Sequence, residues 1–316
     1  MIVVLTGGTG GAKFLQGLAA VVPAPDLTII VNTGDDLVWW GLHVSPDLDS
    51  ITYALAGILS RERGWGVDGD TFECRDAMSR LGQPVWFQLG DRDLATHLVR
   101  TRLRREGRTL TEATRQIVTG LGICSTVLPM SDSSVETRVL TDQGELSFQE
   151  YFVRERFRPS VKQVRFRGTE RAEPAPGVVE AIRSAEAVLL APSNPITSIG
   201  PILAIPGIRD VLRQTSAPVT AVSPIVGSAA VSGPAGNLMR TQGLPVSIHG
   251  IAQAYQDFLD VLLVAMEDVA GAQPESEIGL RGTNILMRTD VDKASLAREA
   301  LAVARSIPRR ARAASS

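Results

Sequence analysis

Short apolar runs that end in glycines or small polar residues alternate with longer segments of helical periodicity along the chain. The first run, Ile2–Leu5, is rich in β-branched residues and stops at a cluster of glycines. Apolar residues then recur three or four positions apart from 12 to 22, and Leu27–Val31 is a second apolar run. Strands that are apolar at every position are typical of parallel sheets covered on both faces. This order predicts an α/β, Rossmann-like, doubly wound fold with a mainly parallel sheet.

The pattern changes between residues 50 and 122, where strand-like runs disappear. Helical periodicity predicts four helices there, at 51–59, 71–81, 94–105 and 111–118. Thr111 is the predicted N-cap of the last helix, and Gly120 with Gly122 is its predicted stop. We therefore expect residues 50–122 to form a helical insertion in the Rossmann-like core.

Alternating apolar residues return at Val135 and predict a β-hairpin that turns at residues 142–144 and ends near Glu150, with a further strand near residues 164–167. Apolar strands at 187–190 and 219–222 then restore the βα rhythm, and a last helix is predicted at 292–305. The predicted organisation is thus a first part of the core at 1–49, the insertion at 50–122, and a second part of the core at 123–307. That second part includes the hairpin excursion near 135–167, and a frayed tail follows at 308–316.

Composition narrows the class of protein. The 316 residues are 44% hydrophobic and 21% charged, with a formal net charge of −2, which argues against disorder and against a general nucleic-acid binder. Two distant cysteines favour a reducing compartment. The N-terminal apolar run is too short for a signal peptide, and no uninterrupted apolar stretch is long enough to span a membrane. We therefore expect a cytoplasmic protein without a membrane or nucleic-acid partner.

The glycine turn Gly7-Gly8-Thr9-Gly10-Gly11 lies between the first predicted strand and the first predicted helix. Backbone N–H groups at such a turn, together with the helix dipole, favour a phosphate, and glycines let the ligand approach the backbone. The turn matches neither of the two standard phosphate loops, because Ala12 and Phe14 break one pattern and Lys13 breaks the other. A tight βα turn without a ligand remains the alternative.

A cluster of carboxylates follows the second predicted strand. Asp35 and Asp36 come just after its carboxyl end, and Asp47 and Asp49 lie two residues apart in Pro46-Asp47-Leu48-Asp49. Carboxylates in this arrangement could share a magnesium ion that bridges phosphate oxygens. The alternative is that Asp47 or Asp49 caps a helix that begins near Ser50.

Three further segments carry polar residues whose role, in a site or only in the fold, must be weighed. The loop at 192–200 holds Ser193 and Asn194, which could bind a nucleotide or simply form a turn. In Leu89-Gly90-Asp91-Arg92-Asp93, followed by His97, the carboxylates could cap a helix or belong to a site. The arginine series from Arg100 to Arg108 is interpreted as a solvated helix face.

Taken in order, these motifs resemble the 2-phospho-L-lactate transferase (CofD) family of deazaflavin coenzyme F-420 biosynthesis. The resemblance runs from Gly7 to about Asp260 and rests on motifs that are weak singly and specific together. They are GGTGGAKF, NTGDD, SPDLDS, RGWG, LGDRDLATH, LPMSD, APSNPITSIGPI, SPIVG, VSGPAG and YQDFLD.

This resemblance implies an activity that the residue patterns alone do not. A phospholactyl or phosphoenolpyruvyl group would pass from a guanosine diphosphate adduct to the terminal ribitol hydroxyl of a deazaflavin, with GMP as the leaving group and Mg²⁺ as the cofactor. The resemblance places the nucleotide on Gly7–Gly11, Ser193 and Asn194, and the metal on Asp35 and Asp49. Asp49, the catalytic candidate, would contact the deazaflavin together with Gln88, although relatives often have a cationic residue at position 88.

Other expectations accompany this one. Four tryptophans that flank the carboxylate motifs offer surfaces for the deazaflavin ring or pack between the insertion and the sheet; they are Trp39, Trp40, Trp65 and Trp86. A homodimer is the expected default assembly. The alternative functions are a nucleotide-sugar-binding regulator of the related CofD-like family and a nicotinamide-dependent oxidoreductase. The sequence leaves the identity of the transferred acid open.

Overall fold

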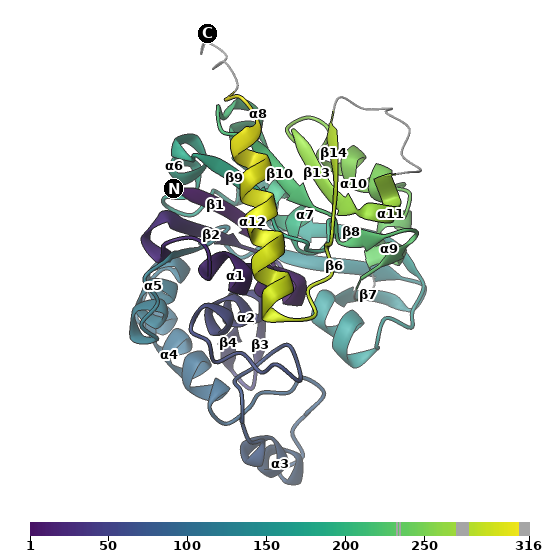
Figure 1. Ribbon diagram of the computed structural model, residues 1–316. Coiled ribbons are helices and arrows are strands. Elements are labelled where there is room, and N and C mark those ends of the chain that lie inside the picture. The colour runs from purple at the N-terminus through teal and green to yellow at the C-terminus, as the bar shows by residue number, and fades with distance from the viewer. Residues whose placement is uncertain (232, 234, 270–277, 310–316) are drawn as a thin grey trace.

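A parallel β-sheet forms the centre of the protein (Figure 1). The computed structural model describes residues 1–231, 233, 235–269 and 278–309. The strands of the central sheet are β1 (Ile2–Thr6), β2 (Leu27–Val31), β5 (Thr126–Pro129), β9 (Ala187–Leu190), β10 (Val219–Val222), β13 (Val261–Ala265) and β14 (Gly279–Thr283). Their order is β14-β13-β10-β9-β1-β2-β5, and every neighbouring pair is parallel. The predicted α/β, doubly wound fold is therefore confirmed.

Both faces of this sheet are apolar, because successive side chains of a strand point to opposite faces. Val3 and Leu5 belong to one hydrophobic core, and Ile2 and Val4 belong to the other. The first core is closed by helices α6 (Val178–Ser184), α7 (Ile199–Ala204), α8 (Ile208–Gln214) and α10 (Ile248–Tyr255). The second is closed by α1 (Gly8–Ala19), α2 (Pro46–Leu55) and α12 (Asp290–Ser306). In Figure 1, α12 crosses in front of the sheet.

Helices dominate residues 50–122, and in Figure 1 they lie to the left of the sheet and below it. They are α3 (Glu73–Arg80), α4 (Asp93–Arg105) and α5 (Leu110–Gly120), preceded by most of α2. The predicted N-cap of α5 was wrong by two residues: the capping side chain is Thr109, which forms a reciprocal capping box with Glu112. A small hairpin of β3 (Leu37–Trp39) and β4 (Leu42–Val44), which the pattern did not predict, precedes α2.

The predicted hairpin near residue 142 forms a separate antiparallel sheet. Its strands are β6 (Glu136–Thr141), β7 (Gly144–Ser147) and β8 (Val161–Arg167), in the order β7-β6-β8. The hairpin strand was expected to reach Glu150, but it ends at Ser147, and Glu150–Arg154 forms a turn of π-helix. Two aromatic residues of this segment, Phe148 and Phe152, line the pocket described below, as does Arg156, whose backbone is left-handed.

The remaining elements are short. They are β11 (Ile225–Val226), β12 (Ala229–Ala230), α9 (Ala235–Thr241) and α11 (Met266–Val269), with three-residue 3₁₀ turns at Ala24–Asp26 and Thr169–Arg171. Within the described ranges, no helix has the length and apolarity needed to cross a membrane. Of the tail predicted to be frayed, residues 310–316 lie outside the described part of the chain.

Candidate functional site

The glycine turn is part of a helix. The helix was expected from Ala12, but α1 begins at Gly8, so its first turn contains most of the glycines. The backbone N–H groups of a first turn have no partners inside the helix, and the helix dipole adds positive potential there. Gly8 has a φ of +67°, a left-handed conformation that favours glycine. A Cβ on Gly10 would collide with the carbonyl oxygen of Pro192.

The Ser193 loop is joined directly to this turn. The Ser193 hydroxyl donates a hydrogen bond to the carbonyl oxygen of Gly7 at 2.8 Å and accepts one from the Gly7 amide at 3.3 Å. β9 and β1 are neighbours, although the chain visits β2 and β5 between them, so their carboxyl ends flank a point where the strand order reverses. Doubly wound sheets bind their ligands in the crevice at such a point.

A pocket of about 460 Å³ opens at this edge. It brings together residues that the sequence scatters over nearly two hundred positions. The predicted site residues that line it are Gly7, Gly8, Thr9, Gly10, Asp35, Asp49, Gln88, Ser193 and Asn194. Gly11 does not line the pocket: a Cβ at that position would meet the side chains of Thr6 and Ser193, so this glycine serves the packing of the turn.

Asp35 and Asp47 are two buried carboxylates that repel each other. Burial raises the pKa of Asp35 well above its usual value, and the charge of Asp47 raises it further. Burial also raises the pKa of Asp47 to about 6, although Asn32 donates a hydrogen bond to that carboxylate at 2.9 Å. One oxygen of Asp35, Oδ1, has no hydrogen-bond partner in the described structure. The carboxylates of Asp35 and Asp47 would therefore both be stabilised by a nearby cation.

The helix-cap alternative for Asp47 and Asp49 was wrong. α2 begins at Pro46, its N-cap position is Ser45, and the Ser45 hydroxyl donates to Asp36 instead of to the helix. Both aspartates lie inside the first turn of α2, where a negative charge interacts favourably with the helix dipole. Their carboxylates are directed by the turn into the pocket that both residues line.

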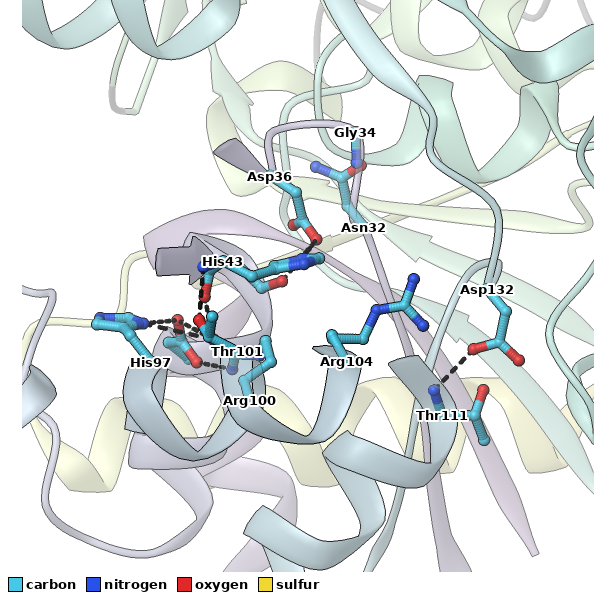
Figure 2. Close-up of polar contacts among 12 residues, drawn as sticks. Asn32, Gly34, Asp36, His43, His97, Arg100, Thr101, Arg104, Thr111 and Asp132 are labelled. Carbon is cyan, nitrogen blue, oxygen red and sulfur yellow. Dashed lines mark hydrogen bonds and ion pairs between the residues drawn. The ribbon is translucent and has the colours of Figure 1, made fainter. Parts of the chain in front are cut away.

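Asp36 does not line the pocket. Its Oδ2 lies 3.0 Å from Nε2 of His43 and accepts a hydrogen bond of 2.5 Å from Ser45. Figure 2 shows Asp36 turned toward His43, on the β3–β4 hairpin side. The expected cluster of four carboxylates thus divides into three that reach the pocket and one that fastens the hairpin.

Asp49 is paired with Arg100, and this corrects the interpretation of the arginine series. Both terminal nitrogens of Arg100 contact the two carboxylate oxygens of Asp49, one of them at 3.2 Å, and Nδ1 of His97 lies 3.6 Å from the same carboxylate. Arg100 is only 2% exposed, so the expectation of a solvated face was wrong for this residue. Figure 2 shows His97 and Arg100 one turn apart on α4. Their spacing of three from each other and from the buried Leu103 was the signal for a buried face.

The LGDRD motif divides into one structural and one pocket carboxylate. Asp91 accepts hydrogen bonds from the amides of Glu73 and Cys74, both at 2.9 Å, and so holds the start of α3. Asp93 lines the pocket and binds the Tyr53 hydroxyl at 2.6 Å and Nε2 of His97 at 3.1 Å. Burial raises the pKa of Asp93, but the contact with His97 and the hydrogen bond from Tyr53 outweigh burial and hold it below its usual range.

The four tryptophans divide between the two alternatives, a pocket surface and packing. Trp65 lines the pocket, whereas Trp39, Trp40 and Trp86 do not line it and pack in a cluster whose member Phe87 does. Sequence reasoning missed Phe148 and Phe152, which line the pocket and stack with ring centroids 5.5 Å apart and planes 7° from parallel. The alternation of apolar residues assigned Phe148 to a strand, and nothing in it indicated a stacked pair.

Comparisons with known proteins bear on the family and on the fold. The family model described as 2-phospho-L-lactate transferase CofD matches residues 2–305. The chain is 44% identical to a 2-phospho-L-lactate transferase of Methanosarcina acetivorans over 89% of this chain and 91% of that protein. It is 42% identical to a phosphoenolpyruvate transferase of Streptomyces griseus over 97% of this chain and 99% of that protein. A crystal structure of a UPF0052 family member from Bacillus halodurans superposes with a TM-score of 0.63 at 15% identity, covering 95% of this chain and 98% of that one, a likeness of fold.

Proposed function

The chain belongs to the 2-phospho-L-lactate transferase CofD family, and from that premise we propose that its donor is a guanosine diphosphate adduct of a small acid. The transferase activity follows from the family. The acceptor that we propose is the terminal ribitol hydroxyl of 7,8-didemethyl-8-hydroxy-5-deazariboflavin, and the leaving group is GMP. The observation that carries this proposal is that the glycine turn, the Ser193 loop and Asp49 line one and the same pocket.

The nucleotide part of the donor fits the glycine turn. Two phosphates would lie at the N-terminus of α1, where the helix dipole favours negative charge, and they would compete there with the Asp47 carboxylate for the Gly8 amide. Ser193 is 4% exposed and is held by Gly7, so the two loops form one preorganised wall. Asn194 lines the same wall and holds its own turn by accepting a hydrogen bond from the amide of Ile196 at 2.9 Å. We propose that this wall holds the guanosine diphosphate.

The carboxylates partly fit the magnesium ion that the family resemblance implies. Asp35 fits well, because it is buried and its Oδ1 lacks a partner. Asp49 can bind the ion with the oxygen lone pairs that its contacts with Arg100 leave free. Asp47 is close enough to Asp35 and Asp49 to interact with the charge of each. No cluster of three or more metal-ligating side chains occurs within the described ranges. Mg²⁺ commonly takes only one or two carboxylates and completes its shell with phosphate and water. We propose Asp35 and Asp49 as its protein ligands.

Phosphoryl-type transfer depends mainly on position and on charge stabilisation. A bound Mg²⁺ would neutralise charge on the phosphates. The protein's own part is to hold the acceptor hydroxyl in line, and Asp49 and Gln88 line the pocket where the deazaflavin would lie. Asp49 is fixed by Arg100 and cannot swing away without breaking a buried ion pair. We therefore propose that the Asp49 carboxylate orients the attacking hydroxyl.

The direct test is mass spectrometry of the product formed from the deazaflavin with the lactyl and the enolpyruvyl adduct in turn, with Mg²⁺ present. The expected product with one adduct carries the acid and one phosphate, and GMP appears in equal amount. Equilibrium binding separates the alternatives. Affinity for GDP and the deazaflavin supports the transferase, whereas affinity for a UDP-sugar alone or NAD alone would indicate the regulator or the oxidoreductase.

The role of Asp49 is tested by Asp49→Asn. We expect turnover to fall by at least about a hundredfold, because the variant removes one carboxylate from both the metal and the hydroxyl. Asp26→Asn is the matched control, since Asp26 is exposed and remote from the pocket, and it should retain full activity. Circular dichroism should show both variants folded. Near-normal turnover by Asp49→Asn would contradict the assignment.

A further inference from the structure

The pocket has an excess of negative charge. Four carboxylates line it, from Asp35, Asp47, Asp49 and Asp93. Among the described lining residues, Arg156 is the one Lys or Arg. Under the proposed function, on which this inference rests, the donor adds a diphosphate and the carboxylate of its acid. Such a ligand needs cationic partners, so the place of Arg156 matters for binding.

Arg156 has no partner in the described structure, in contrast to its neighbours. Arg154 forms ion pairs with Glu150 at 2.8 Å and with Glu155 at 2.9 Å. Arg158 donates a hydrogen bond to the carbonyl oxygen of Glu155 at 3.1 Å. Arg156 is exposed at the pocket, and none of the described side chains or carbonyl groups pairs with it. An unpaired guanidinium with five donors remains available for a ligand.

The backbone presents Arg156 in an unusual way. Arg156 has a φ of +50° and Phe157 a φ of +46°, both in the left-handed region that non-glycine residues rarely adopt. Two interactions hold the strained pair: the Phe157 amide donates to the carbonyl oxygen of the buried Tyr151 at 2.8 Å, and the Phe157 ring stacks on Phe152 at 6.1 Å. The turn also follows a π-helix, a feature that is frequent at functional sites. Strain that the surroundings maintain is typical of residues positioned for a ligand.

We propose that Arg156 binds the carboxylate of the acid that the enzyme transfers. The phosphates would have the N-terminus of α1 and a Mg²⁺ held by Asp35 and Asp49, whereas the acid carboxylate has no other Lys or Arg in the described lining. The alternative cation, Arg100, is buried and occupied by Asp49. A guanidinium matches a carboxylate through two parallel hydrogen bonds, which also fixes the orientation of the acid. Arg156 would thus determine specificity for donors that carry a carboxylate.

The test compares two donor ligands that differ only in that carboxylate. One is the lactyl adduct of GDP, and the other is the isopropyl ester of GDP, which replaces the carboxylate with a methyl group. In the variant Arg156→Asn the charge is lost, while Asn tolerates the left-handed backbone. We expect Arg156→Asn to weaken binding of the lactyl adduct by about ten- to a hundredfold and to change binding of the isopropyl ester less than about twofold.

Two further variants complete the comparison. Arg158→Asn removes a neighbouring arginine outside the pocket and should leave both affinities unchanged. Arg156→Lys keeps the charge without the planar fork and should restore only part of the lost affinity. Equal weakening of both ligands by Arg156→Asn would assign the residue to the phosphates and overturn this inference, as would no weakening of either. If the wild-type protein binds neither ligand, the proposed function itself fails, and this inference fails with it.

Discussion

Arg100 and Asp49 form a buried ion pair that joins α4 to α2. Their side chains are 2% and 7% exposed, and they come from α4 and α2. Burial lowers the pKa of Arg100, but the attraction of Asp49 outweighs burial and raises it, so the guanidinium stays charged. A pair of this kind fixes the orientation of the one carboxylate to which we assign both metal and acceptor contacts.

The first prediction concerns this pair. Arg100→Gln leaves the buried Asp49 without its partner, and we expect a loss of about 3–5 kcal/mol in the free energy of unfolding, because an uncompensated buried charge is costly. Urea unfolding followed by circular dichroism measures the loss. Arg102→Gln is the control, since Arg102 lies on the exposed side of the same helix with its side chain 57% exposed, and it should lose less than about 0.5 kcal/mol. The double variant Arg100→Gln/Asp49→Asn should recover part of the stability, and no recovery would contradict the electrostatic explanation.

Arg100 also shows why the sequence predicted the site only in part. Five arginines in nine residues suggest a solvated helix face, and four of the five are indeed not buried. Arg100 differs because it shares a helical face with the buried residues His97 and Leu103. Four strands of the central sheet, β1, β2, β9 and β10, and the glycine turn were predictable, because apolar runs and glycines act locally, whereas β5, β13 and β14 were not predicted. The partner of Arg100 lies 51 positions earlier, a relation that no local pattern contains.

The segment from Phe148 to Phe157 shows a second limit. Its alternating apolar residues predicted a strand to Glu150, but the strand ends at Ser147 and a π-helix follows. The positive φ of Arg156 and Phe157 has no sequence signal, since neither residue is a glycine or an asparagine. Tertiary contacts, including the stacking of Phe157 on Phe152, impose this conformation against the local preference.

The second prediction concerns the glycine turn. Gly10→Ala places a Cβ against the Pro192 carbonyl, a backbone atom that cannot rotate away, so we expect loss of GDP binding and a lower free energy of unfolding. Isothermal titration with GDP and a thermal melt measure the two effects. Gly120→Ala at the end of α5 is the matched control, because its Cβ would enter open space, and it should bind GDP normally. Normal GDP affinity in Gly10→Ala would remove the turn from the nucleotide site.

The third prediction is a pH dependence away from the pocket. Burial raises the pKa of Asp257, but hydrogen bonds from Arg209 and Arg213 outweigh it and hold that pKa below its usual range. A carboxyl whose pKa is lower in the folded state stabilises the protein above the unfolded-state pKa and loses that effect as the pH falls through the folded-state value. Asp257→Asn should therefore cost up to about 1 kcal/mol at neutral pH, and the difference from the wild type should shrink below about pH 4. A difference that is constant from pH 7 to pH 3 would contradict the ionic origin.

The fourth prediction separates stability from function at the buried carboxylates. Asp35 and Asp47 repel each other in the metal-free protein, and Asp47→Asn removes one charge while the new amide oxygen can still accept the hydrogen bond from Asn32. At pH 8 and without divalent cations, we expect Asp47→Asn to raise the free energy of unfolding by about 1 kcal/mol or more, because a buried carboxylate without a cation is unfavourable. Added Mg²⁺ should stabilise the wild type more than the variant, since only the wild type keeps the full negative charge that attracts the cation.

Thermal melts with EDTA and with Mg²⁺, paired with turnover measurements, test this expectation. Asp142→Asn provides the control, because Asp142 lies at the exposed turn beside β6 and β7, and its melt should respond to Mg²⁺ as the wild type does. Turnover by Asp47→Asn should fall even as its stability without metal rises. This opposition is expected where a buried charge serves ligand binding and lowers the stability of the unliganded protein. If Asp47→Asn is destabilised in EDTA, the two carboxylates do not repel each other in the folded protein, and the case for a cation between the glycine turn and α2 fails.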